Sequence, residues 1–340
     1  MRRPYLLFLG AATDPSDAKT AFGLRDWCRD DVAGQHRLPG CAVDLGLPEL
    51  DPAAAAEAGV GSMLIGVAPV GGRVEEAWIA PLVSALRCGL DLVSGLHQRL
   101  EEVPEIAEAA KETGRDLHNV RHATRSFPVG TGRKRPGKRL LTVGTDCALG
   151  KKYTALAIAA ELKRRGVDAD FRATGQTGLM IAGRGVAIDA VVADFIAGAA
   201  EWLSPAADPD HWDVIEGQGS LHSPAYAGVS LGLLHGSQPD ALVVCHDPGR
   251  EHMVDLPHVP MPGVNEAAEL AVMLAKRTNP AARVVGVSVN TSGLAEGRRG
   301  PVLAALRQET KLPVVDPMVE GVAELCDALS VPHHAAAGAA

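Results

Sequence analysis

The sequence predicts an α/β protein with two domains, each built around a parallel sheet. Short apolar runs alternate with helical patterns along most of the chain, which is typical of a parallel sheet covered by helices on both faces. A length of 340 residues is enough for two such domains. A loop bracketed by Gly144 and Gly150 also separates a strand pattern from a helix pattern, as in phosphate-binding α/β domains.

The first domain is predicted at residues 1–124. Its alternating pattern predicts strands at 5–9, 41–45, 62–68, 90–94 and 116–120, and helices at 75–87 and 104–112. Ligands of parallel sheets bind beyond the carboxyl ends of the strands, which places the Gly71-Gly72-Arg73 turn and His97 on the functional edge. A plain tight turn explains Gly71-Gly72 equally well, and a structural role explains His97.

Residues 125–139 are basic, rich in proline and glycine, and without hydrophobic periodicity, so we predict a linker there. Its charges are expected to be solvated rather than to reach an anionic ligand. The second domain is predicted at 140–332, and the small-residue tail at 333–340 is expected to be disordered.

The second domain is predicted to contain a second parallel sheet. After the phosphate loop we predict helices at 151–165, 189–202 and 265–277, and strands at 168–174, 211–216, 241–245 and 283–289. Several of these strands end in polar residues. Glu216 and a Gly-x-Gly turn follow one strand, and His246 and Asp247 follow another. Carboxyl ends of parallel strands meet at one edge of the sheet, so these side chains are expected to face the phosphate loop.

The stretch from Leu140 to Lys151 predicts a phosphate site. An apolar strand turns through the glycine-bracketed loop into a helix that opens with Gly150-Lys151. Backbone N–H groups of such a loop and the positive helix N-terminus face an anion, and the lysine reaches the phosphate oxygens. The predicted phosphate contacts come from the loop and the lysines after it: Gly144, Thr145, Asp146, Cys147, Gly150, Lys151 and Lys152.

Two departures from the usual phosphate loop change the expected chemistry. Five residues rather than four separate Gly144 and Gly150, and Lys152 stands where a serine or threonine hydroxyl ligates Mg²⁺. An ammonium cannot ligate a divalent cation and repels one. We therefore expect phosphate binding without a metal ion.

Composition excludes several classes of protein. The net charge of -8 argues against nucleic acid as the main partner. The six cysteines are scattered without metal-site spacing, which is typical of reduced thiols in a cytoplasmic protein. The apolar run after Met1-Arg2-Arg3 is short and lacks a cleavage pattern, so it predicts a buried strand rather than a signal peptide. No stretch is long and apolar enough for a membrane span, so we expect small-molecule partners.

The longer loop and the segment Asp213-Val214-Ile215-Glu216-Gly217-Gln218-Gly219-Ser220 resemble the dethiobiotin synthetase branch of P-loop proteins. In that branch a glutamate at this strand end helps to hold Mg²⁺. The resemblance implies one reading of the chain, an ATP- and Mg²⁺-dependent ligase or kinase using Asp146 and Glu216. Lys152 in place of the loop threonine puts that metal site in doubt. Relatives of this branch commonly dimerise, so we expect a homo-oligomer.

A second resemblance spans nearly the whole chain. The chain is similar to the DgcN family, whose segments occur here in the same order: GVAPVGG at 66–72, DLVSGLH at 91–97, GTDCALGK at 144–151, GQTG at 175–178, EGQGSLHSP at 216–224 and CHD at 245–247. The resemblance implies a Rossmann-like N-terminal domain and a P-loop NTPase-like C-terminal domain. It also implies an N-acetyltransferase of D-amino acid metabolism, which moves acetyl from acetyl-CoA to the amine of D-glutamate.

The residues are compatible with that reaction, because a phosphate loop can hold the phosphates of coenzyme A without a metal. Acetyl transfer to an amine needs a general base, N–H donors for the thioester oxygen, and cations for the substrate carboxylates. The candidate bases are Glu216, His222, His246 and Asp247. We favour His222 or Glu216, because a histidine titrates near neutral pH and a buried glutamate has a raised pKa. His246 and Asp247 form an orienting pair in the alternative interpretation.

Three further residues are candidates for contacts with the substrate: Arg172, Gln176 and Arg250. Ordinary ion pairing explains the two arginines equally well. Cys147 lies near a helix N-terminus, where a thiol pKa is lowered, so an acetyl-cysteine route is conceivable. Phosphate binding in the same loop disfavours that route. A non-catalytic nucleotide-sensing module is the third reading of the chain, and saturable binding without turnover distinguishes it.

Overall fold

The computed structural model describes residues 1–69, 71–122 and 125–329. The chain divides into two compact units. Unit 1 comprises Met1–Thr124 and Gln176–Ala190, and unit 2 comprises Arg125–Gly175 and Val191–Ala340. The segment 176–190, which we predicted as part of the second domain, therefore packs with the N-terminal residues. The tail predicted to be disordered, 333–340, lies outside the described residues.

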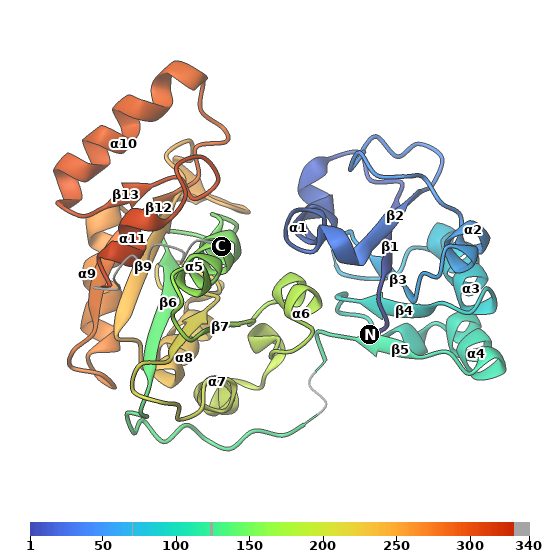
Figure 1. The fold of residues 1–340 in the computed structure, drawn as a ribbon, viewed down its shortest axis with the longest axis horizontal. Coiled ribbons are helices and arrows are strands. Elements are labelled where there is room, and N and C mark those ends of the chain that lie inside the picture. Colours follow the sequence, from blue (N-terminus) through green and yellow to red (C-terminus); the bar gives the residue numbers. More distant parts are fainter. Residues whose placement is uncertain (70, 123–124, 330–340) are drawn as a thin grey trace, which may run out of the picture. The chain divides into compact units, whose positions relative to one another are not determined.

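Unit 1 is built on a five-stranded parallel sheet with the strand order β2-β1-β3-β4-β5. Its strands are β1 (Tyr5–Gly10), β2 (Val32–Arg37), β3 (Ser62–Ile65), β4 (Asp91–Ser94) and β5 (Leu117–Asn119). Its helices are α1 (Lys19–Trp27), α2 (Pro52–Glu57), α3 (Glu76–Arg87), α4 (Pro104–Thr113) and α6 (Gln176–Ala182). All six residues of β1 are buried, as expected of a central strand covered on both faces. Helix α1 packs beside α6, and α3 packs beside α4 (Figure 1).

The strand predicted at 41–45 is wrong. That segment has no regular secondary structure, and the second strand of the sheet is β2. Val43 and Leu45 are nevertheless buried, which explains the apolar pattern of this segment. The Gln35 side chain of β2 holds the segment, donating to Asp44 at 2.9 Å and accepting from the Leu45 N–H at 2.8 Å.

Helix α6 begins at Gln176, within the GQTG segment at 175–178 to which sequence analysis assigned no helix or strand. Met180 is fully buried in the core of unit 1, and the hydroxyls of Thr20 and Thr177 share a buried hydrogen bond of 2.8 Å. The helix predicted at 189–202 is shorter than expected, because two short 3₁₀ turns precede α7 (Ile196–Leu203). Segment 176–190 is thus an excursion from unit 2 that completes unit 1.

Unit 2 has a six-stranded parallel sheet with the order β13-β12-β9-β6-β8-β7. Its strands are β6 (Lys138–Gly144), β7 (Ala169–Arg172), β8 (Trp212–Ile215), β9 (Ala241–His246), β12 (Arg283–Val289) and β13 (Val314–Val315). Its helices, besides α7, are α5 (Lys151–Arg164), α8 (Ala227–Ser237), α9 (Val264–Ala275), α10 (Glu296–Thr310) and α11 (Ala323–Asp327). A small antiparallel hairpin of β10 (His252–Met253) and β11 (Leu256–Pro260) follows β9. Because β6 lies between β8 and β9 in a parallel sheet, the carboxyl ends of these three strands lie side by side at one edge.

The basic segment 125–139, whose last two residues open β6, is held along unit 2, and the expectation of solvated charge is wrong for two of its arginines. The Arg139 side chain is fully buried and donates to the Ser204 hydroxyl at 2.7 Å. Arg135 donates to the carbonyls of Ser204 and Gly236 at 2.8 and 2.9 Å. Buried guanidinium groups require such acceptors, so these two charges serve the packing of unit 2.

No helix in the described parts of the chain combines the length and the apolar character of a membrane span.

Candidate functional site

The phosphate loop connects β6 to α5 as predicted. Gly150 adopts a φ of 98°, a left-handed conformation that glycine reaches without strain, and it directly precedes the first helical residue. Ala148 also has a positive φ, of 53°. These two residues turn the chain sharply, so that the N-terminus of a 14-residue helix faces the loop. Such a terminus attracts anions through its unpaired N–H groups and its dipole.

Lys151 is held inside the loop. Its side chain is 6% exposed, and Nζ donates to the Asp146 carbonyl at 2.6 Å. Burial lowers the pKa of Lys151. Thr142 in β6 links the surrounding elements, because its hydroxyl donates to the Lys151 carbonyl at 3.2 Å and accepts from the Gly217 N–H at 2.9 Å. The lysine, the strand and the Gly-x-Gly turn therefore form one connected framework.

Arg250 orders the phosphate loop, which differs from the predicted carboxylate contact. Its guanidinium donates to the carbonyls of Cys147 and Ala148, both at 2.9 Å, and lies 3.2 Å from the Asp146 carboxylate. The N–H of Val254, in the β10–β11 turn, donates to the same Asp146 oxygen at 2.7 Å. The buried Asp146 carboxylate and the Arg250 fork thus join the hairpin to the loop, and we assign Arg250 a positioning role.

Glu216 lies just beyond β8, as predicted, and is 4% exposed. One carboxylate oxygen accepts from the N–H groups of Thr174 and Gly175, at 2.9 and 3.0 Å. Burial raises the pKa of Glu216, while those N–H groups and the charges of Lys152 and Lys151 oppose the rise. These hydrogen bonds hold the carboxylate at the turn after β7, so Glu216 is a weaker candidate for the general base.

His246 is the titratable residue best placed against the phosphate loop. Its Nδ1 lies 3.1 Å from the hydroxyl of the buried Thr145, which fixes the ring. Burial lowers the pKa of His246, although the charge of Asp247 opposes this. The Asp247 carboxylate accepts from the Gly249 N–H at 2.9 Å and lies 3.5 Å from Arg250. At neutral pH the imidazole is uncharged and can accept a proton.

The side chain of His222 is 18% exposed. Its backbone N–H donates to the Ser220 hydroxyl, which in turn donates to the Thr145 carbonyl at 3.1 Å. Nδ1 lies 3.8 Å from a carboxylate oxygen of Glu266, and Nε2 is buried with no hydrogen-bond partner among the described residues. The ring lines a cavity of about 20 Å³, which has room for about one water molecule and not for an acetyl group.

The predicted substrate contacts Arg172 and Gln176 each have a side-chain partner within their own unit. Arg172 donates to Asp213 at 2.5 Å and pairs with Asp170 at 3.3 Å. Asp213 is the second residue of β8, so Arg172 pairs with a buried carboxylate that lies before the carboxyl end of this strand. Gln176 is the first residue of α6 in unit 1, where its side-chain oxygen accepts from Arg121.

The predicted low pKa of Cys147 is wrong. Burial raises the pKa of this thiol, and the charge of Lys151 only partly opposes the effect. A thiol that stays protonated is a poor nucleophile. The acetyl-cysteine route therefore loses its physical basis.

Several framework residues escaped the sequence analysis. Thr142, Thr174, Ser220 and Glu266 all contact predicted site residues. Thr142 carried a signal, since a polar residue in an otherwise apolar strand beside a phosphate loop requires a buried partner. Thr174 and Glu266 depend on contacts between segments far apart in the sequence, which no local pattern indicates, as does the bond from Ser220 to the Thr145 carbonyl.

Comparison with known proteins shows which family the chain belongs to. A family model described as a P-loop domain of unknown function, DUF1611_C, matches residues 128–326. Its N-terminal companion, described as a Rossmann-like domain, matches residues 36–123. The chain belongs to the DUF1611 family. The predicted fold class, a Rossmann-like domain followed by a P-loop domain, is thereby confirmed.

Two relatives of this DUF1611 chain carry the name D-glutamate N-acetyltransferase. The protein from Tritonibacter scottomollicae is 50% identical over 327 residues, which cover 96% of this chain and 98% of the relative. The protein from a Pseudoalteromonas species is 47% identical over 330 residues, covering 96% and 99%. A crystal structure of a DUF1611 protein from Anabaena variabilis superposes with a TM-score of 0.87 at 33% identity, covering 97% of this chain and 99% of that one. The family resemblance inferred from the sequence is confirmed.

Proposed function

We propose that this protein is an N-acetyltransferase that moves acetyl from acetyl-CoA to the amine of D-glutamate. The observation that carries the proposal is the name shared by two relatives that are 50% and 47% identical over 96% of the chain.

The phosphate loop is the proposed site for the phosphates of coenzyme A. The N-terminus of α5, Lys151 and Lys152 supply positive charge, and Arg250 keeps the loop in shape. Acetyl transfer leaves these phosphates unchanged, so it needs no Mg²⁺ to neutralise a transferred phosphoryl group.

The surroundings of Glu216 favour this reaction over phosphoryl transfer. In a Mg²⁺-dependent enzyme this carboxylate is needed beside the metal. Here two backbone N–H groups hold it, and the positive charge of Lys152 acts on its pKa. A lysine whose charge acts on the carboxylate opposes the binding of a divalent cation there.

We propose His246 as the general base. Its neutral imidazole takes a proton from the ammonium of the bound amino acid, and the free amine attacks the thioester carbonyl carbon. The C–S bond then breaks and the CoA thiolate leaves. The thiolate takes up the proton that the attacking nitrogen loses, which gives free CoA thiol and a neutral amide, and the imidazolium releases its proton to solvent. The Thr145 hydroxyl orients the ring throughout, at 3.1 Å from Nδ1. A positioned base of this kind typically contributes about 10²–10⁴-fold to the rate.

The test is release of free CoA thiol, with the amide identified by mass spectrometry. Purified protein is given acetyl-CoA with D-glutamate, L-glutamate or D-aspartate, in buffer with and without added Mg²⁺. The proposal predicts N-acetyl-D-glutamate as the preferred product at a rate that Mg²⁺ does not change. Formation of ADP from ATP with Mg²⁺, with no thiol release from acetyl-CoA, overturns it in favour of a ligase or kinase.

A further inference from the structure

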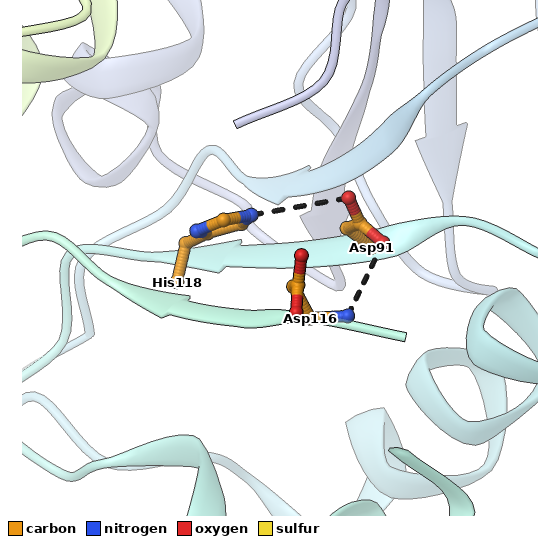
Figure 2. A group of neighbouring side chains, drawn as sticks. All are labelled: Asp91, Asp116 and His118. Atoms are coloured by element: carbon orange, nitrogen blue, oxygen red, sulfur yellow. Dashed lines mark hydrogen bonds and ion pairs between the residues drawn. The ribbon is translucent and has the colours of Figure 1, made fainter. Parts of the chain in front are cut away.

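The amino end of the unit 1 sheet carries a cluster of ionisable side chains that acetyl transfer does not use. Asp91 is the first residue of β4, Asp116 directly precedes β5, and His118 lies within β5. In the parallel register Val93 lies opposite His118. Side chains two residues apart on a strand share a face, so Asp91 lies on the face of Val93 and Asp116 on the face of His118. The three side chains therefore converge from neighbouring strands, and the His118 ring faces the Asp91 carboxylate (Figure 2).

Asp91 presents a buried oxygen without a hydrogen-bond partner. The residue is 2% exposed, and its Oδ1 accepts from the Asp116 N–H at 3.2 Å. Oδ2 and the His118 Nε2 are both buried, and within the described parts of the chain neither has a hydrogen-bond partner. They lie 3.9 Å apart, too far for a hydrogen bond. A buried carboxylate oxygen left in this way is costly, so the geometry calls for a further group between the two atoms.

An ion pair with Arg2 leaves this gap open. The cationic neighbour Arg2 lies 3.6 Å from Oδ1, on the other oxygen, and its side chain is half exposed.

We propose that Asp91, Asp116 and His118 bind a divalent transition-metal ion of the Zn²⁺ type. The three ligand atoms all lie within 4.8 Å of one another. Zinc–nitrogen and zinc–oxygen bonds are about 2.0–2.2 Å, so two ligands of one ion lie up to about 4 Å apart, as Oδ2 and Nε2 do. Asp116 is exposed and can rotate inward to complete the set. An imidazole among the ligands favours Zn²⁺ and its neighbours over Mg²⁺ or Ca²⁺, and water fills the remaining positions.

Such an ion joins β4 to β5, the edge strand of the sheet. It stabilises the native state by an amount that grows with the logarithm of the free metal concentration above Kd, because the ligands come together only on folding. The site is in unit 1, whereas the phosphate loop is in unit 2. The inference is therefore independent of the proposed acetyltransferase activity.

The test uses the full-length protein, first freed of metal with a chelator that is then removed. Zn²⁺ is titrated against it in competition with a chromophoric chelator. We expect one saturable site per chain, with affinity at least tenfold weaker in Asp116→Asn and in His118→Gln. His258→Gln removes an exposed imidazole in β11 and is the matched control, with unchanged affinity.

Loading with Co²⁺ supplies a second readout, because its visible absorption reports ligand geometry and should be lost in His118→Gln. Asp116 is exposed, so its variant is expected to fold, which circular dichroism checks. Zinc binding that is absent in the wild type, or equal in the wild type and both variants, overturns the proposal and leaves a water molecule as the bridging group. Neither result depends on whether the protein transfers acetyl groups.

Discussion

His246 combines a fixed orientation with a lowered pKa, and these two properties suit it to accept a proton beside the phosphate loop. We predict that His246→Gln lowers kcat by about 10²–10⁴-fold, since glutamine keeps a polar side chain but cannot take up the proton. Acetyl transfer is measured by thiol release between pH 5 and 8. Because burial lowers the pKa, the wild-type rate should decline only below about pH 6.5, the ordinary value for histidine.

The matched control is His258→Gln in β11, which should leave both the rate and its pH profile unchanged. A His246→Gln enzyme with full activity and the wild-type acid limb contradicts the assignment. A similar loss in His222→Gln alone moves the role to His222.

His211 has a raised pKa, unlike His246, and this predicts how the stability of the protein depends on pH. Burial lowers its pKa, but hydrogen bonds to Asp168 and Asp213 at 2.8 and 3.1 Å outweigh this, so the pKa is raised overall. The stabilisation is fully present below the unfolded pKa of about 6.5 and is lost as pH rises through the folded pKa. In urea unfolding, His211→Gln should therefore destabilise the protein more at pH 6 than at pH 8.5, by about 1.4 kcal/mol for each unit of pKa elevation. Equal destabilisation at both pH values contradicts this.

At the scale of elements, the close approach of β6 and the Gly-x-Gly turn determines where Glu216 lies. A Cβ placed on Gly217 would be 1.6 Å from the Thr142 carbonyl oxygen, a backbone atom that cannot move aside cheaply. We predict that Gly217→Ala destabilises unit 2 by about 3 kcal/mol or more and weakens acetyl-CoA binding, because overpacking at this level shifts the backbone. Urea unfolding followed by tryptophan fluorescence measures the loss.

Gly228→Ala is the control for that variant, since a Cβ there has nothing within 4 Å and the residue lies in α8. It should stabilise the protein by about 0.5–1 kcal/mol, as expected for alanine in a helix. If Gly217→Ala unfolds at the wild-type midpoint, the approach of the two elements is looser than described.

Sequence analysis could predict the features whose residues follow one another directly in the chain. The strand, the loop and the first turn of α5 are contiguous, so local spacing alone indicated the phosphate loop. Glu216 and His246 followed from the rule that strand ends share an edge. The partners of Arg250 and Arg172 come from other segments, and a local pattern cannot distinguish an arginine that holds a loop from one that binds a substrate. Strand β2, with glycine, glutamine and histidine in its centre, lacks the apolar run that identifies a strand.

At the scale of the molecule, segment 176–190 leaves unit 2 and completes unit 1. No periodicity reveals this excursion, because it depends on contacts with residues more than a hundred positions away, such as Thr20. We predict that Met180→Ala destabilises unit 1 by about 2–5 kcal/mol, the usual cost of removing a fully buried side chain. Hydrogen exchange should show reduced protection of β1 and β3, with β6 and β9 little changed.

Met273→Ala provides the comparison, since Met273 in α9 is exposed and its truncation should change protection nowhere. Equal loss of protection in both sheets of Met180→Ala contradicts the assignment of α6 to the core of unit 1.

The central claim is that the phosphate loop holds an acetyl-CoA donor without a metal. The most direct measurement is isothermal titration of the protein with acetyl-CoA, in Mg²⁺-free buffer and again with added Mg²⁺. We predict the same affinity in both buffers, a loss of at least tenfold in Lys151→Ala, and no change in Lys163→Ala, which removes an exposed lysine from the same helix. Failure to bind acetyl-CoA, together with ATP binding that requires Mg²⁺, would contradict the account.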